Sequence, residues 1–353
     1  MTVTPNGGPG GDGGTFGPNT PGTTTLGIQE AINAQQTIGA TRGPSHRVVI
    51  ASGVHFPGTV VISGSHLELA GEVALPGQSP GPSQPFIRQI KLVADPSLTK
   101  QSQVYVRGLF LNELDYLPPA GVTLTDVGTE DLGFLTNPNP GQRGIVFDNT
   151  NGFTQYFRAK GRTSILDGNG TSGTPGDGTG QAILIKGANS SSAHYFFDEV
   201  KYVQSSLTSG SGVFAFGNGA LIDGLTVGWL DVNFQNQGSS SIFNVLGTGG
   251  TKTRVRATSV RYVRWEVHQP DCHVFVIDPN AGSIAFQMSV SEIHTDVNPN
   301  TNTAFLYKVT NSKWAPQPGT ALRIHHLFRA GPGTTDCTTA LDPGLHAVID
   351  AVI

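Results

Sequence analysis

The feature that most constrains this chain is a repeat of short apolar runs in its second half. Seven runs of similar composition start roughly 30 to 40 residues apart, at Gly144, Ala182, Gly212, Ser241, His273, Thr303 and His346. A second and a third apolar run follow most of them after a polar or glycine-rich turn. Three strand-length runs per repeat predict one coil of a parallel β-solenoid, in which equivalent strands stack and bury a continuous core.

Two apolar columns favour this solenoid over a β-sandwich, which would show hairpin turns and no fixed repeat length. When the coils are aligned on the third run, the first column contains Val200, Val227, Val260 and Val290, and the second, three residues on, contains Val203, Leu230, Val263 and Ile293. Because like residues recur at like positions, we expect both columns to lie in the core.

The N-terminal part of the chain has a different character. Residues 1–25 are rich in Gly, Pro and Thr, which predicts a flexible arm that contributes nothing to the core. Ile28, Ala31 and Ile32 then follow at helical spacing behind Thr24 or Thr25 as a helix N-cap, so we expect a short capping helix. Residues 26–353 are predicted to form one solenoid domain, with loop insertions near 112–143, 168–181 and 329–345 that project from one face.

The entry segment carries a resemblance to a known family. Leu26-Gly-Ile-Gln-Glu-Ala-Ile-Asn-Ala, followed by Val48-Val-Ile-Ala-Ser-Gly-Val-His-Phe, resembles the capping helix and first strand of the right-handed parallel β-helix proteins of the pectate-lyase-like group, which includes phage tailspikes. The resemblance implies an all-β, right-handed, single-stranded parallel β-helix with coils of roughly 30 residues. Enzymes, adhesins and virion proteins share this fold, so it does not decide between them.

Charge and hydropathy narrow the classes of partner. The formal net charge is −4 and charged residues make up 13 % of the chain, without a basic block, so we expect no nucleic-acid partner. No apolar run approaches the ~18 residues of a membrane span, and the Met1 segment has no secretory signal pattern. The apolar run Ala347-Val-Ile-Asp-Ala-Val-Ile lacks a polar cap, which predicts that another subunit covers it.

Three acids are the candidate catalytic residues. The alignment places Asp231, Glu266 and Asp296 near one another on successive coils, with Asn233 and His294 beside them. Because stacked strands lie ~4.8 Å apart, such carboxylates could reach the separations used by glycosidases. The alternative is a solvated ladder of charges separated by Arg264 and His294. Asp198 with Glu199, and Asp167 with Asp177, are weaker candidates for the same role.

Three aromatic residues are the candidate glycan-binding residues. Tyr202, Trp229 and Tyr262 align in one column. An exposed aromatic ladder binds the apolar faces of sugar rings, whereas the alternation that buries the neighbouring valines favours stacking inside the core. Both interpretations stay open at this point.

Metal and thiol chemistry are not expected. His268, Asp271, Cys272 and His273 are ligand types, but they crowd into six residues without a second ligand pair at zinc spacing. We therefore predict no metal and no cofactor. The two cysteines, Cys272 and Cys337, are predicted to be reduced thiols, with a single disulfide as the alternative.

These observations predict a non-enzymatic surface protein. The leading hypothesis is a virion spike, fibre or decoration component at the virion surface or outside the cell. It would assemble as a homo-oligomer, by resemblance a trimer, would contact other virion proteins through residues 1–25, and would bind a polysaccharide or cell-surface glycan. The alternatives are a polysaccharide lyase or glycoside hydrolase that uses Asp231, Glu266 or Asp296, and a prokaryotic extracellular adhesin or filament subunit.

Overall fold

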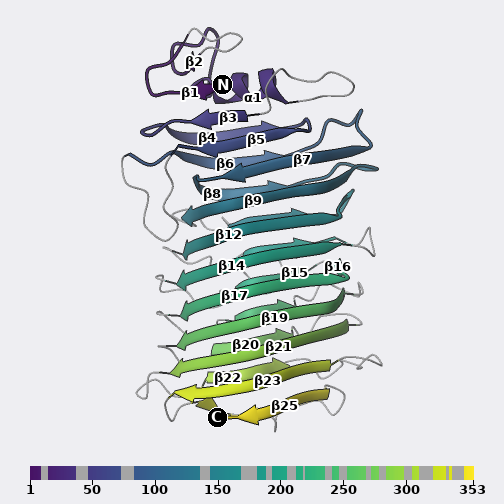
Figure 1. Cartoon of the computed structure of the whole chain (residues 1–353). Helices are drawn as coiled ribbons and strands as arrows, with labels where there is room; N and C mark the ends of the chain where they lie inside the picture. The colour runs from purple at the N-terminus through teal and green to yellow at the C-terminus, as the bar shows by residue number, and fades with distance from the viewer. Residues whose placement is uncertain are drawn as a thin grey trace.

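The fold is described from a computed structural model of the whole chain. The described residues are 1–8, 15–36, 47–72, 83–135, 144–167, 181–187, 193–204, 212–217, 219–234, 241–245, 253–267, 272–277, 284–297, 304–309, 321–330, 334–335 and 346–353. They form a parallel β-helix whose coils stack from the capped N-terminal end to β25 (Figure 1).

The strands fall into two parallel ladders, which are joined where Phe110 and Leu111 of β8 pair with Gly133 and Phe134 of β9. The long ladder contains β2 (Thr15–Phe16), β1 (Thr2–Val3), β3 (Arg47–Ile50), β5 (Leu67–Gly71), β7 (Lys100–Arg107), β9 (Thr123–Leu135), β12 (Tyr156–Asp167), β14 (His194–Gln204), β17 (Gly224–Phe234), β19 (Thr253–Val267), β21 (Ile284–Val297), β23 (Ala321–Ala330) and β25 (His346–Val352). The two-residue strands β11 (Phe153–Thr154) and β16 (Leu221–Ile222) pair with β9 and β19.

The short ladder covers the other side of the core. It contains β4 (His55–Ile62), β6 (Phe86–Leu92), β8 (Phe110–Tyr116), β10 (Ile145–Asp148), β13 (Gln181–Lys186), β15 (Gly212–Gly217), β18 (Ser241–Val245), β20 (Cys272–Ile277), β22 (Ala304–Val309) and β24 (Thr334–Thr335). From β3 and β4 to β23 and β24, each coil therefore contributes one strand to each ladder, which confirms the predicted parallel solenoid.

A helix and two short strands cover the first coil. Helix α1 (Ile28–Gln35) confirms the predicted capping helix, and its buried face includes Ile28 and Ile32. The position before it is Gly27 in the left-handed conformation, and the Thr25 hydroxyl accepts a hydrogen bond from the Gln29 N–H. The prediction that residues 1–25 contribute nothing to the core is wrong for the described part, because β1 pairs with β3 and Val3 is fully buried.

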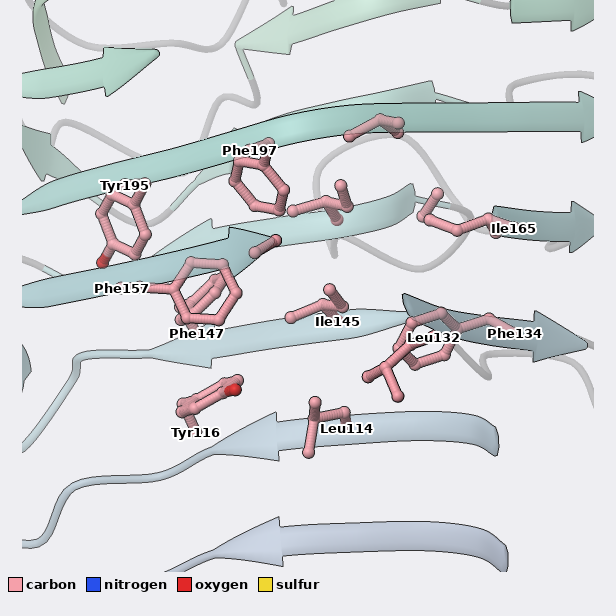
Figure 2. Packing of buried hydrophobic residues seen from close by; sticks show 14 of the residues in the cluster. Leu114, Tyr116, Leu132, Phe134, Ile145, Phe147, Phe157, Ile165, Tyr195 and Phe197 are labelled. Atoms are coloured by element: carbon pink, nitrogen blue, oxygen red, sulfur yellow. The ribbon is translucent and has the colours of Figure 1, made fainter. Parts of the chain in front are cut away.

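The core is a column of aromatic and aliphatic side chains between the two ladders (Figure 2). The rings of Tyr116 and Phe147 stack on neighbouring coils at 4.8 Å, and Phe147 meets Phe157 and Tyr195 edge to face, also at 4.8 Å. The Asn149 side chain donates a hydrogen bond to the Tyr195 hydroxyl, which satisfies a polar group inside the column. Stacked coils of this kind bury one continuous apolar interior.

Two predicted features need correction. Residues 112–135, expected as part of a loop insertion near 112–143, belong largely to β8 and β9 and pair in register with their neighbours. The run at His346, aligned with the first strand of each coil, pairs with β23 and therefore belongs to the long ladder. Most of the other two predicted insertions, 168–181 and 329–345, lies outside the described residues.

Candidate functional site

Several strands of the long ladder bend where two consecutive side chains point outward. In β14, Asp198 and Glu199 lie between the buried Phe197 and Val200. In β17, Gly228 and Trp229 occupy the equivalent positions, and β19 and β21 continue the same two columns. Because every coil bends at the same place, these outward residues form a corner that runs along the solenoid.

A groove of about 760 Å³ follows this corner. Its lining residues are Asp131, Gly161, Arg162, Asp198, Glu199, Trp229 and Asp231. Gly161 is a bulge residue with a φ of 62°, and a Cβ there would overlap the Asp131 carboxylate. That carboxylate accepts a hydrogen bond from the Arg162 N–H at 2.9 Å, so the bulge fixes one wall of the groove.

An aromatic stack forms the other wall. Trp229 has 43 % of its surface exposed, and its ring stacks on Tyr262 of the next coil with centroids 3.9 Å apart. The stack continues from Tyr262 to His294 at 4.8 Å and from His294 to Phe328 at 4.2 Å. Partial burial raises the pKa of the Tyr262 phenol. Since one face of Trp229 is covered by Tyr262, the other is available to a ligand in the groove.

The groove carboxylates are held by cations and backbone N–H groups. Glu199 lies 2.6 Å from Arg162 Nε, and Asp198 accepts a hydrogen bond from the Gly161 N–H at 3.2 Å. Asp231 contacts Arg264 at 3.2 Å and Lys201 at 3.9 Å. The lining therefore contains four carboxylates and one arginine beside the exposed indole of Trp229, and cations contact Glu199 and Asp231 among those carboxylates.

The three predicted catalytic acids are placed in two columns rather than one. Asp231 is in register with Arg264, whereas Glu266 is in register with Asp296 one column further along the strands. Arg264 bridges the columns, because it contacts both Asp231 and Glu266, the latter at 3.1 Å. Asp231 lines the groove and Glu266 does not, whereas the side chain of Asp296 lies outside the described residues.

The predicted aromatic column is correct for two of its three residues. Trp229 and Tyr262 are in register, but Tyr202 is in register with Val232 and Trp265 and is buried in the core. The alignment slipped by three residues in β14, so Val200 shares a column with Leu230 and not with Val227. Tyr202 therefore cannot line the groove.

Sequence reasoning found part of this site and missed the rest. The weaker candidate pair, Asp198 and Glu199, joins Trp229 and Asp231 in the groove. Asp131 and Arg162 were missed because they come from β9 and β12, where β12 contains an extra residue at the bulge. The only sequence signal for that bulge is the glycine at position 161.

A second hollow of about 550 Å³ lies at an N-terminal corner. Its lining residues are Arg47, His66, Leu67, Glu68, Gln103, Tyr105 and Asp126. Tyr105 donates a hydrogen bond to Asp126 at 2.5 Å, and burial together with this carboxylate raises the pKa of the phenol. Glu68 lies between Arg47 and Arg107. This hollow offers polar groups, and the phenol ring of Tyr105 in its lining is half-buried.

The described residues contain no group of three His, Cys, Asp or Glu side chains suited to a metal ion. His268, Asp271, Cys337 and the side chain of Cys272 lie outside them, so the prediction about the thiols stays a prediction. Within the described part of the chain, no helix has the length and apolar character needed to cross a membrane.

The fold and the groove define a parallel β-helix protein with a groove at one corner that is rich in carboxylates and contains an exposed tryptophan. Comparison with known proteins adds no family: no protein-family model, curated protein or solved structure matches the chain.

Proposed function

We propose that this protein is a surface protein of the pectate-lyase-like β-helix kind that binds a glycan in the Trp229 groove. The observation that carries the proposal is the half-exposed Trp229 ring, braced from behind by Tyr262 and surrounded by carboxylates and cations. Aromatic faces bind the apolar faces of sugar rings, and charged groups at the rim bind their hydroxyls. A groove that holds both kinds of group is suited to a carbohydrate.

The ion pairs of Glu199 and Asp231 support the proposal that the Trp229 groove binds a glycan without cleaving it. A general acid for glycoside hydrolysis must carry a proton, which requires a carboxyl in an environment that disfavours its charge. Glu199 and Asp231 instead contact cations, Arg162 in one case and Arg264 with Lys201 in the other. Among the classes of protein that share this fold, we propose a spike, fibre or decoration component of a virion, and a prokaryotic adhesin or filament subunit stays the alternative.

The test is a glycan array followed by calorimetric titration with the strongest hit. Trp229→Ala is expected to weaken binding by about tenfold, since losing roughly 60 Å² of apolar contact costs ~1.5 kcal/mol. Tyr156→Ala is the matched control, because Tyr156 is also an exposed aromatic residue, at 38 %, but does not line the groove. Equal affinity of Trp229→Ala and wild type for every hit would refute the proposal.

A lyase or glycosidase that uses the same groove is the second candidate. The observation in its favour is that Glu199 and Asp231, on neighbouring strands, flank Trp229, with Cα atoms roughly 8 Å apart from the strand spacing and rise. Reducing-sugar release or a gain in absorbance at 235 nm would reveal turnover of the array hits. If wild type cleaves the glycan and Glu199→Gln and Asp231→Asn abolish this activity, the groove is a catalytic site and the proposal of binding alone is wrong.

Oligomeric assembly and a virion location belong to the same proposal. They rest on the resemblance of the entry segment, because homotrimeric spikes use this fold. Light scattering of the full chain is expected to give three times the mass of one chain. A monomeric mass at micromolar concentration would refute the trimer and leave glycan binding to be judged on its own test.

A further inference from the structure

Three polar side chains on the last coils of the long ladder form a hydrogen-bonded chain. Ser289 Oγ of β21 lies 3.1 Å from His325 Nε2 of β23. His325 Nδ1 lies 2.8 Å from Asp350 Oδ2 of β25. The serine and the carboxylate therefore contact opposite nitrogens of one imidazole.

The stacking of the coils explains why these residues meet. Ser289 is in register with Arg323, two residues before His325. Ile324 and His326 are in register with Ile349 and Ala351, which places His325 beside Asp350. The three residues come from three successive coils, so the rigid parallel ladder sets their separation.

Asp350 is held as a carboxylate. Arg323 donates two hydrogen bonds to it, from Nε at 2.9 Å and from a terminal nitrogen at 3.2 Å. Its pKa is lowered first by the hydrogen bond from Arg323, and His325 lowers it further. A carboxylate at Nδ1 favours the imidazole tautomer with the proton on Nδ1, and this leaves Nε2 free to accept the Ser289 hydroxyl proton.

The chain of residues is open to a substrate. The side chains of His325 and Asp350 are 37 % and 31 % exposed, and Ser289 is half-buried on the outer face. Ser259 and Arg323 hold the register positions on either side of Ser289, and the Arg323 guanidinium is engaged by Asp350 on the next coil. Ser289 lies two coils from Trp229, or ~10 Å along the axis.

We infer that these three residues hydrolyse an ester, and that the substrate is an O-acylated glycan. Ser289 is the nucleophile, His325 is the general base, and Asp350 is the residue that positions His325. The Ser289 oxygen attacks the acyl carbonyl carbon while His325 Nε2 takes the hydroxyl proton. The ester C–O bond breaks, the alcohol leaves with that proton, and an acyl-serine remains. Water, deprotonated by His325, then releases the carboxylic acid and restores the serine. Ester hydrolysis itself does not depend on glycan binding at the Trp229 groove.

The test uses a fluorophosphonate probe and p-nitrophenyl acetate on the full-length protein. The probe is expected to modify Ser289, as located by peptide mass spectrometry, and Ser289→Ala and His325→Ala are expected to lower acetate-ester turnover at least about 10³-fold. Ser97→Ala, at an exposed serine on a turn of the N-terminal coils, is the matched control and should retain labelling and turnover. Circular dichroism confirms that each variant folds, which is expected because all three side chains lie on the outer face.

Asp350 has its own readout because it acts through His325. Asp350→Asn is expected to lower kcat with little change in KM and to alter the pH profile, and Asp350→Glu is expected to restore part of kcat. The inference is overturned if folded wild type is not labelled at Ser289, or if Ser289→Ala hydrolyses the ester as fast as wild type. If Trp229→Ala loses glycan binding but still hydrolyses the ester, this result supports the interpretation that the Trp229 groove and the Ser289 site are separate.

Discussion

Replacing Gly161 by alanine should disturb the wall of the groove by a calculable amount. Gly161 has a φ of 62°, where an L-residue costs about 1–2 kcal/mol. The new Cβ would also overlap the Asp131 carboxylate, which accepts a hydrogen bond from the Arg162 N–H at 2.9 Å. Losing a hydrogen bond to a charged group costs a further ~1.5–3 kcal/mol. We therefore expect Gly161→Ala to lower the free energy of unfolding by about 2.5–5 kcal/mol.

Gly121 provides the matched control. Its φ is 78°, but a Cβ there would meet nothing within 4 Å. Gly121→Ala should therefore cost only the backbone part, about 1–2 kcal/mol. Replacing glycine by alanine also stabilises the protein by lowering the conformational entropy of the unfolded chain. This contribution is common to both variants, so it cancels when their free energies of unfolding are compared. The difference between them, about 1.5–3 kcal/mol, isolates the clash with Asp131.

The assay is urea unfolding followed by circular dichroism, with the midpoint and slope of each variant compared. In an Asp131→Ala background the clash is removed, so adding Gly161→Ala should then cost no more than Gly121→Ala does in wild type. The reasoning is refuted if Gly161→Ala and Gly121→Ala destabilise the protein equally. It is also refuted if Asp131→Ala leaves the cost of Gly161→Ala unchanged.

Three further predictions concern the first coils and the core. Burial, and next the charge of Glu113, raises the pKa of Asp115 to about 8, so the folded state keeps a proton that the unfolded state releases. The contribution of this carboxyl to stability is therefore fully present below about pH 4 and is lost as the pH rises toward 8, and Asp115→Asn should remove this part of the pH dependence in urea midpoints measured from pH 4.5 to 9. Phe147→Ala should cost about 3–5 kcal/mol, since it empties a fully buried site beside Tyr116, and Phe147→Leu should cost clearly less in the same unfolding assay. Asn149→Ala removes two buried hydrogen bonds of 2.8 and 3.0 Å and should cost about 2–3 kcal/mol, whereas a loss under 0.5 kcal/mol would contradict their role.

The fold was predictable because the sequence repeats apolar runs with the length of one coil. Each coil buries apolar residues in two ladders, so strand-length runs recur with the coil length, and α1 shows the ordinary helical spacing of Ile28, Ala31 and Ile32. The role of residues 1–8 and 15–25 was not predictable from composition. Their glycines and threonines suggest an arm, but Val3 and Phe16 are enough to seat β1 and β2 on the first coil.

The site was only partly predictable, since it depends on register. Where a strand bends, two outward residues follow one another, so buried positions are three apart there, as in Val227 and Leu230. In β14 the true pair is Phe197 and Val200, but Val200 and Val203 show the same spacing, so spacing alone allows the slip that misplaced Tyr202. Contacts between coils, such as that of Ser289 with His325, have no local sequence signal at all.

The register itself is the central claim, because the groove and the serine, histidine and carboxylate chain both depend on it. Thr226 and Ser259 are exposed and in register on β17 and β19, which places their Cα atoms ~4.8 Å apart and within reach of a disulfide. Arg261, two residues further on, lies more than about 7 Å from Thr226, beyond that reach.

The measurement is oxidation of two double-cysteine variants in a background with Cys272→Ser and Cys337→Ser, read by peptide mass spectrometry. Thr226→Cys with Ser259→Cys is predicted to form the disulfide, and Thr226→Cys with Arg261→Cys is predicted to remain reduced. Disulfide formation in the second variant and not in the first would contradict the register and, with it, the account of both sites.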